Sequence, residues 1–106
     1  MPLSAQATDL SAADFVGQQG EVFARFDATT QTSGNVSYGV RVEEQRYFVK
    51  TAGEPSDSKP LLPHPQRVAL LRNAVRLARA AAHRALPQLL NVVESQDGPV
   101  LVYEWV

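Results

Sequence analysis

One lysine, Lys50, ends the short apolar run Tyr47-Phe48-Val49 and is the residue with the clearest potential chemistry in this sequence. Its ammonium is a compact positive charge with three N–H donors, which suits it to phosphate oxygens. Upstream lies Gly34, a residue at which the backbone can turn sharply or approach a ligand closely. A strand lysine facing a glycine-bearing turn is therefore a candidate phosphate site. The same residues also fit an edge-strand lysine in water beside an ordinary turn glycine.

The elements that must position Lys50 form a predicted hairpin. Apolar and polar residues alternate over residues 36–42, and a second short run covers residues 46–51. Alternation predicts half-buried strands, and the polar segment Glu43-Glu44-Gln45-Arg46 predicts the turn between them. Side chains alternate along a strand, so Phe48 and Lys50 share one face. A further strand over residues 22–27 makes the hairpin part of a three-stranded antiparallel meander.

The strongest helix signal runs from Gln66 to about Ala82. Its apolar residues recur with helical spacing and predict a buried stripe, broadened by Leu70, Leu77 and Ala81. The stripe consists of Val68, Leu71, Val75, Ala78 and Ala82. A second, basic stripe holds Arg72, Arg76, Arg79 and His83. This stripe fits a solvated helix face, or a surface for an acidic or phosphorylated partner.

Two strands after the helix and one short helix before the sheet complete the prediction. The strands cover residues 89–94 and 100–106, and Ser11 caps a helix near residues 12–16. The fold class is α+β: a five-stranded antiparallel sheet with one main helix packed on it. Residues 1–20 are expected to be an N-terminal arm, loose over residues 1–10, and residues 21–106 the domain. Because the chain stops inside an apolar run, we expect a fragment that ends at a lobe boundary.

Composition excludes several classes of function. The net charge is −1, and no aromatic residues interleave with the arginines, so a nucleic-acid partner is not expected. There is no cysteine, no signal peptide, and no apolar run near the roughly 20 residues that span a bilayer. We therefore expect a cytoplasmic protein without a membrane partner. The two histidines have no clustered cysteine or carboxylate, so no metal site is expected in this chain.

The order of these elements resembles the N-terminal, ATP-binding lobe of the protein-kinase-like superfamily, which includes Ser/Thr protein kinases and aminoglycoside-phosphotransferase-like enzymes. That family has a glycine-rich hairpin, a third-strand lysine, a helix, two strands and a hinge. The resemblance covers roughly residues 20–106. Gly34 and Val36 match the last glycine and the valine of the Gly-x-Gly-x-x-Gly-x-Val loop. Thr29 and Gln31 stand where the two earlier glycines would be.

The resemblance implies a role for each of a few residues. Lys50 would be the catalytic lysine that contacts the α- and β-phosphates of ATP. Gly34 and Val36 would lie against the nucleotide, and Tyr103 would be the gatekeeper beside it. Glu104 and Val106, at the hinge, would offer backbone groups to the adenine. The partners implied are ATP with magnesium and the C-lobe of the parent chain, where the magnesium ligands and catalytic loop would lie.

The sequence departs from the family pattern at three places. Only one of the three loop glycines is present, Phe48 replaces a small residue beside the lysine, and the helix contains no glutamate. The residue expected to pair with Lys50 falls at Asn73 or Ala74. These departures keep a second function open, that of a pseudokinase-type interaction module using the Arg-rich helix or the Pro-rich loop at residues 52–65. The exposed hinge side predicts self-association in either case.

Overall fold

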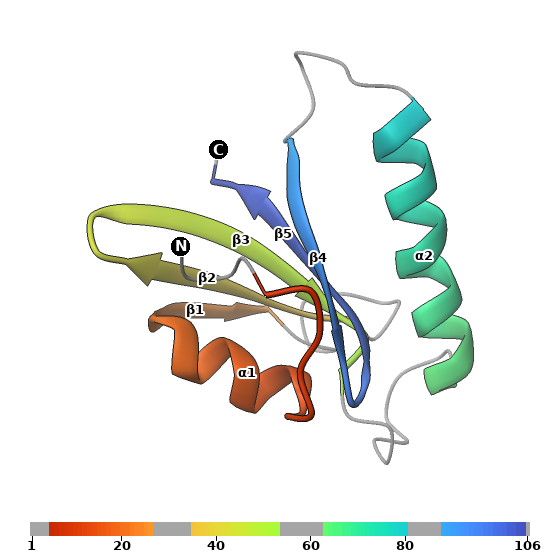
Figure 1. Cartoon of the computed structure of the whole chain (residues 1–106), viewed down its shortest axis with the longest axis horizontal. Coiled ribbons are helices and arrows are strands. Elements are labelled where there is room, and N and C mark those ends of the chain that lie inside the picture. Colours follow the sequence, from red (N-terminus) through yellow and green to blue (C-terminus); the bar gives the residue numbers. More distant parts are fainter. Residues whose placement is uncertain (1–4, 27–34, 54–62, 81–87, 106) are drawn as a thin grey trace.

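The computed structural model describes residues 5–26, 35–53, 63–80 and 88–105. They form a five-stranded antiparallel sheet with a helix on each face (Figure 1). The strands are β1 (Glu21–Phe26), β2 (Val36–Val42), β3 (Gln45–Thr51), β4 (Leu89–Ser95) and β5 (Gly98–Glu104). The helices are α1 (Ala12–Gln19) and α2 (His64–Ala80). The predicted α+β class, with one main helix and one short N-terminal helix, is confirmed.

The strands lie in the order β1-β2-β3-β5-β4, so the last strand returns between β3 and β4. The hairpin turn is tighter than the sequence predicted, because β3 already begins at Gln45. Glu43 takes a left-handed conformation with φ 57°, which suits the turn of a two-residue hairpin loop. This turn sets the register in which Ser37 pairs with Lys50 and Gly39 pairs with Phe48.

The α1 face of the sheet carries the larger apolar core. Ser11 caps α1 by accepting a hydrogen bond from the Asp14 N–H at 3.2 Å. The buried Asp97 carboxylate accepts a second bond, from the Ala12 N–H at 3.1 Å, and so joins α1 to the β4–β5 turn. These bonds hold the helix where it buries Phe15 and Val16. The strand residues of this core are Val36, Tyr38, Val40, Val49, Val93, Val100 and Val102.

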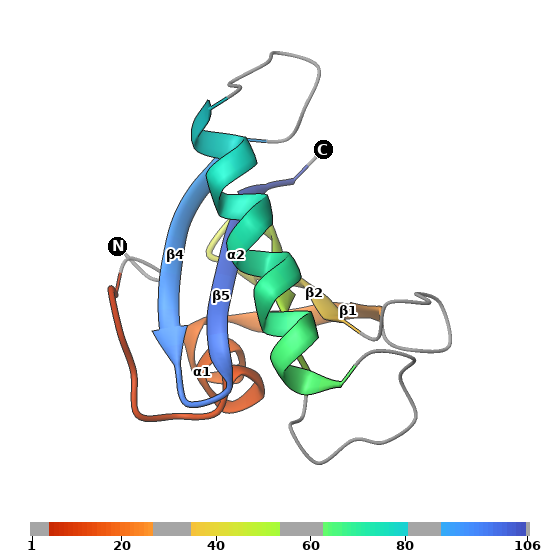
Figure 2. The same ribbon diagram turned by 90° about the vertical axis from the view of Figure 1, so that its right-hand side faces the viewer.

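The α2 face carries a smaller core and differs in detail from the predicted stripe. Leu71 and Val75 are buried against Leu101, as the helical spacing predicts. Leu70 and Leu77 do not broaden the stripe, because they are 44% and 62% exposed. Figure 2 looks onto α2 and shows it crossing in front of β4 and β5. Because α2 crosses the sheet at one place, helix residues on either side of that crossing do not pack against the strands.

The N-terminal segment is not the loose arm that the sequence predicted. Ala7 pairs in parallel with Glu94 of the edge strand β4. Three backbone hydrogen bonds hold it there: Thr8 N–H to the Glu94 carbonyl, Glu94 N–H to Gln6, and Gln96 N–H to Leu10. An edge strand presents unpaired backbone groups, and the segment satisfies part of them. Within the described parts of the chain, no helix is long and apolar enough to cross a membrane.

Candidate functional site

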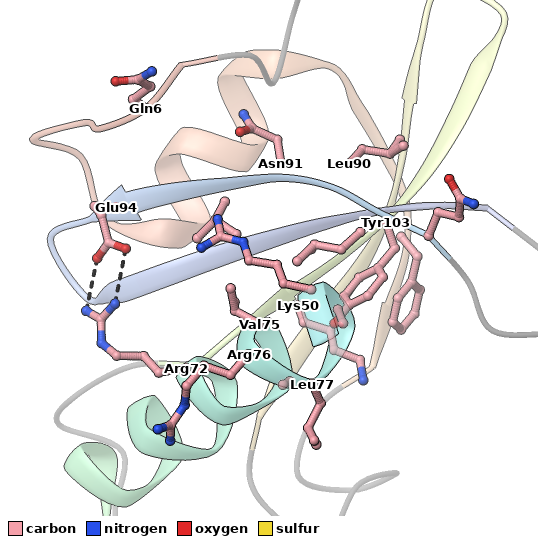
Figure 3. Close-up of a pocket in the computed structure, with 17 residues that line it drawn as sticks. Gln6, Lys50, Arg72, Val75, Arg76, Leu77, Leu90, Asn91, Glu94 and Tyr103 are labelled. Carbon is pink, nitrogen blue, oxygen red and sulfur yellow. Dashed lines mark hydrogen bonds and ion pairs between the residues drawn. The ribbon is translucent and has the colours of Figure 1, made fainter. Parts of the chain in front are cut away.

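A groove of about 1190 Å³ opens between α2 and the sheet (Figure 3). Its apolar lining comes from Val75 on the helix and from Leu89, Val92 and Tyr103 on the strands. Lys50 and Phe48 of β3 also line it, which confirms that these two side chains share a face. The groove therefore combines an apolar floor with the lysine that the sequence singled out.

Lys50 is held in the middle of the sheet by its neighbours on both sides. It pairs with Ser37 of β2 and with Leu101 of β5, and its side chain is half-buried. Its Nζ atom lies 5.6 Å from the ring centroid of Tyr103 and 6.0 Å from that of Phe48. Aromatic faces attract a cation at such distances without neutralising its charge. No carboxylate among the described residues forms an ion pair with Lys50.

The helix contributes only positive charge to this groove. Arg72, Arg76 and Arg79 line it, and among the described residues the single lining carboxylate belongs to Glu94 of β4. Arg72 donates two hydrogen bonds to Glu94, of 3.0 and 3.1 Å, which Figure 3 marks with dashed lines. This bond to Glu94 raises the pKa of Arg72 above its ordinary value. Since these two charges cancel, the uncompensated cations of the groove are Lys50, Arg76 and Arg79.

One of the two helix residues expected opposite Lys50 lines the groove, and it is an alanine. The sequence left two candidates, Asn73 and Ala74. Ala74 is half-buried and lines the groove, whereas Asn73 is exposed outside the lining and accepts a 3.4 Å hydrogen bond from Arg76. The structure therefore identifies Ala74 as the groove-facing residue of the two. The whole helix contains no aspartate or glutamate.

Aromatic rings crowd the sheet beside Lys50. The Phe48 ring lies 6.2 Å from the Trp105 ring and 6.0 Å from Phe26, and Phe23 meets Trp105 edge-on at 5.0 Å. Gly39 makes this approach possible, because a Cβ there would lie 2.6 Å from Phe23 Cζ and 3.1 Å from Trp105 Cζ3. The ring of Phe48 therefore belongs to an aromatic cluster of Phe23, Phe26, Phe48 and Trp105.

The structure does not bring all the predicted site residues together. Val36 is 6% exposed and packs in the α1-face core, on the opposite side of the sheet from Lys50. Glu104 is exposed at the end of β5, and its N–H donates to the Gln88 carbonyl at 3.0 Å. The N–H of Glu104, one of the backbone groups expected to bind adenine, is therefore already bonded within the chain. Gly34 and Val106, like Thr29 and Gln31, lie outside the described residues.

The β2 residues on the Lys50 face were missed by the sequence analysis. Ser37 and Gly39 pair with Lys50 and Phe48, so they occupy the face that Val36 was expected to share. A two-residue turn at Glu43 and Glu44 would have given this register from the sequence. The buried Arg67 of α2 was missed as well, because an arginine has no place in an apolar stripe.

The described residues contain no group of three His, Cys, Asp or Glu side chains that could hold a metal ion. Comparisons of the chain with models of protein families, with curated proteins and with solved structures found no match. Function has to be inferred from the groove and the residues that line it.

Proposed function

We propose that this chain is the nucleotide-binding lobe of a protein-kinase-like phosphotransferase, in which Lys50 binds the phosphates of ATP. One observation carries the proposal: Lys50 is half-buried in a groove and has no ion-pair partner among the described carboxylates. A partly buried cation loses hydration, and the Tyr103 and Phe48 rings attract it without supplying a counter-ion. A phosphate group would supply the missing negative charge.

The arrangement around Lys50 supports the same proposal. The element order is the one on which the family resemblance rests, and β5 lies directly beside β3. The expected gatekeeper, Tyr103, consequently faces Lys50, and the Glu104 carbonyl follows at the end of that strand. The chain would bind ATP with magnesium in the cytoplasm, a compartment that fits its lack of cysteine.

Catalysis belongs to the parent protein and not to this chain alone. The described residues do not fit a magnesium ion by themselves, because they offer no cluster of ligating side chains. The metal ligands and the catalytic aspartate would come from the second lobe. Phe23 is 40% exposed in the aromatic cluster, and we propose that the C-lobe, or a second copy of this chain, covers it.

Nucleotide titration of the isotope-labelled chain, followed by NMR, tests this function. ATP with magnesium should shift the signals of Lys50, Phe48, Tyr103 and the only tryptophan, Trp105. A Lys50→Met variant should lose about tenfold in affinity, since a hydrogen bond to a charged group contributes about 1.5–3 kcal/mol. Arg46→Ala is the matched control, because it removes a β3 cation that does not line the groove. Unchanged affinity in Lys50→Met would contradict the proposal.

A second candidate function is an interaction module that binds an acidic partner through α2. The observation in its favour is the absence of any carboxylate from a helix that presents Arg72, Arg76 and Arg79 to the groove. The two candidates differ in what Lys50 does. If an acidic peptide binds equally well to the wild type and to Lys50→Met, while ATP binds to neither, the interaction module is the better assignment.

A further inference from the structure

The groove contains more positive charge than one phosphate-binding lysine requires. Of the residues that the structure describes, four cations line it, Lys50 and the three α2 arginines, against the single carboxylate of Glu94. With Arg72 and Glu94 paired, three positive charges remain on a chain whose formal net charge is −1. A groove lined by charge of one sign concentrates counter-ions of the other sign. The excess indicates a ligand with several negative charges.

The helix is the source of that excess. Positions 72, 76 and 79 are four and three residues apart, so these side chains leave α2 on one side. The span from Arg72 to Arg79 is about 10 Å along the helix axis, at roughly 1.5 Å per residue. Arg76 and Arg79 are exposed, and no described carboxylate pairs with either. Arg79 is therefore available to a ligand in the groove, and Arg76 is held only by its 3.4 Å hydrogen bond to Asn73, which a ligand could replace.

We propose that α2 is itself a phosphate-binding element, and that Arg76 and Arg79 together with Lys50 hold a polyphosphate chain directly. This inference rests on the proposed function and names the ligand chemistry of the same site. In the family pattern a helix glutamate pairs with the lysine, so that pair adds no net charge. Here Ala74 lines the groove instead, and the helix adds the exposed Arg76 and Arg79 to the lining.

A site in which α2 and Lys50 both bind phosphate should depend less on magnesium than a site that uses Lys50 alone. Guanidinium groups recognise phosphate oxygens through paired N–H donors, and they neutralise the charge that a metal ion would otherwise screen. A chain of phosphates should therefore bind without magnesium, and the base should add little. Affinity should rise from AMP to ADP to ATP and fall with increasing salt.

Calorimetric titration of the whole chain with sodium tripolyphosphate, and separately with ATP, tests the inference. Both titrations are run in EDTA and again with magnesium. We expect tripolyphosphate to bind in EDTA, and the Arg76→Ala/Arg79→Ala double variant to bind it about tenfold more weakly, as for the loss of two charge-assisted contacts. The charge-matched control is Arg41→Ala/Arg46→Ala, which removes two cations on β2 and β3 that do not line the groove.

A second pair of variants tests the charge at the helix without removing an arginine. Ala74→Glu places a carboxylate in the groove, and Ala74→Gln places an uncharged side chain of similar size there. We expect Ala74→Glu to weaken tripolyphosphate binding in EDTA several-fold relative to Ala74→Gln, because the carboxylate would neutralise Lys50. Circular dichroism of each variant checks that α2 is intact.

The other possible results contradict either the inference about α2 or the proposed function. If Lys50→Met weakens ATP binding and the arginine double variant does not, the helix is not a phosphate ligand, and the proposed function stands. A strict requirement for magnesium in the tripolyphosphate titration also overturns the inference. If an acidic peptide binds through Arg76 and Arg79 while tripolyphosphate does not, the helix is a peptide site. If neither phosphate ligand binds to the wild type, the proposed function is wrong as well.

Discussion

The two faces of the sheet differ in a way that helix length does not explain. The short α1 covers a face on which Val16, Val40 and Val49 are fully buried. The longer α2, with 17 residues, buries only Arg67, Leu71 and Val75. The difference lies in the strands, because α1 faces a core of strand valines, whereas α2 packs on β5 and β4, where the buried strand residue of the α2-face core is Leu101. The extent of apolar contact is therefore set by what the sheet offers the helix.

The α1 face mainly stabilises the fold, whereas the α2 face contains the candidate binding groove. The α1 face is a closed apolar core. Burying its side chains away from water contributes most of the hydrophobic free energy that stabilises the sheet. The α2 face leaves room for a groove in which charged and aromatic side chains remain partly exposed. A protein that must admit a ligand between a helix and a sheet cannot pack that face completely. Measurements of stability should show whether the α1 face is packed more tightly than the α2 face.

The largest expected effect comes from truncating a core phenylalanine on the α1 face. Phe15→Ala should lower the free energy of unfolding by about 3–4 kcal/mol, because the residue is 3% exposed and its loss leaves a cavity. Phe23→Ala makes the same deletion at a position that is 40% exposed, and about 1 kcal/mol or less is expected. Urea denaturation followed by circular dichroism measures both. Equal losses would mean that the α2 side of the sheet is packed as tightly as the α1 side.

An intermediate effect is expected where α2 meets the β4–β5 turn. Gly98 has φ +112°, and a Cβ there would lie 2.9 Å from Val68 Cγ2. Gly98→Ala should therefore cost about 2 kcal/mol, from backbone strain and from the contact with the helix. Thermal denaturation measures the loss of stability. Adding Val68→Ala to the variant should recover only the part of the loss that comes from the contact with the helix.

A matched glycine provides the control for this prediction. Gly17 lies in α1 with no atom within 4 Å of an added Cβ. Gly17→Ala should raise stability by about 0.5–1 kcal/mol, since alanine favours a helix over glycine. A Gly98→Ala variant as stable as the wild type would show that α2 does not approach the turn this closely.

The smallest expected effect is the pH dependence of Tyr103 in the groove. Burial raises the pKa of Tyr103 above its ordinary value of 10.0, so folding favours the neutral phenol. The resulting stability is fully present below pH 10 and is lost as the pH rises through the folded-state pKa. Denaturation midpoints from about pH 9 to 11 should fall less steeply in Tyr103→Phe than in the wild type. Identical slopes would mean that the groove leaves this phenol fully hydrated.

Local patterns in the sequence were enough to predict most of the elements. Alternation located β2, a short apolar run after a polar turn located β3, and apolar spacing located α2 to within two residues of its start at His64. The predicted neighbours Phe48 and Lys50 share a face as the strand period requires. Two errors came from tertiary contacts. The N-terminal segment was taken for a loose arm because its pairing with Glu94 joins residues far apart in the sequence, and Leu70 and Leu77 were taken for core.

The sequence by itself determined which residues carry charge: a strand lysine, a helix with arginines and no carboxylate, and an alanine or asparagine where a partner for the lysine would stand. Only the tertiary structure decided that Lys50, Arg76 and Arg79 line one groove and that Glu94 cancels Arg72. It also placed Val36 on the opposite face from Lys50. The physical reason is register: a turn one residue longer would move Val36 and the other even-numbered β2 residues to the face of Lys50, and the apolar pattern of a short strand does not fix that length.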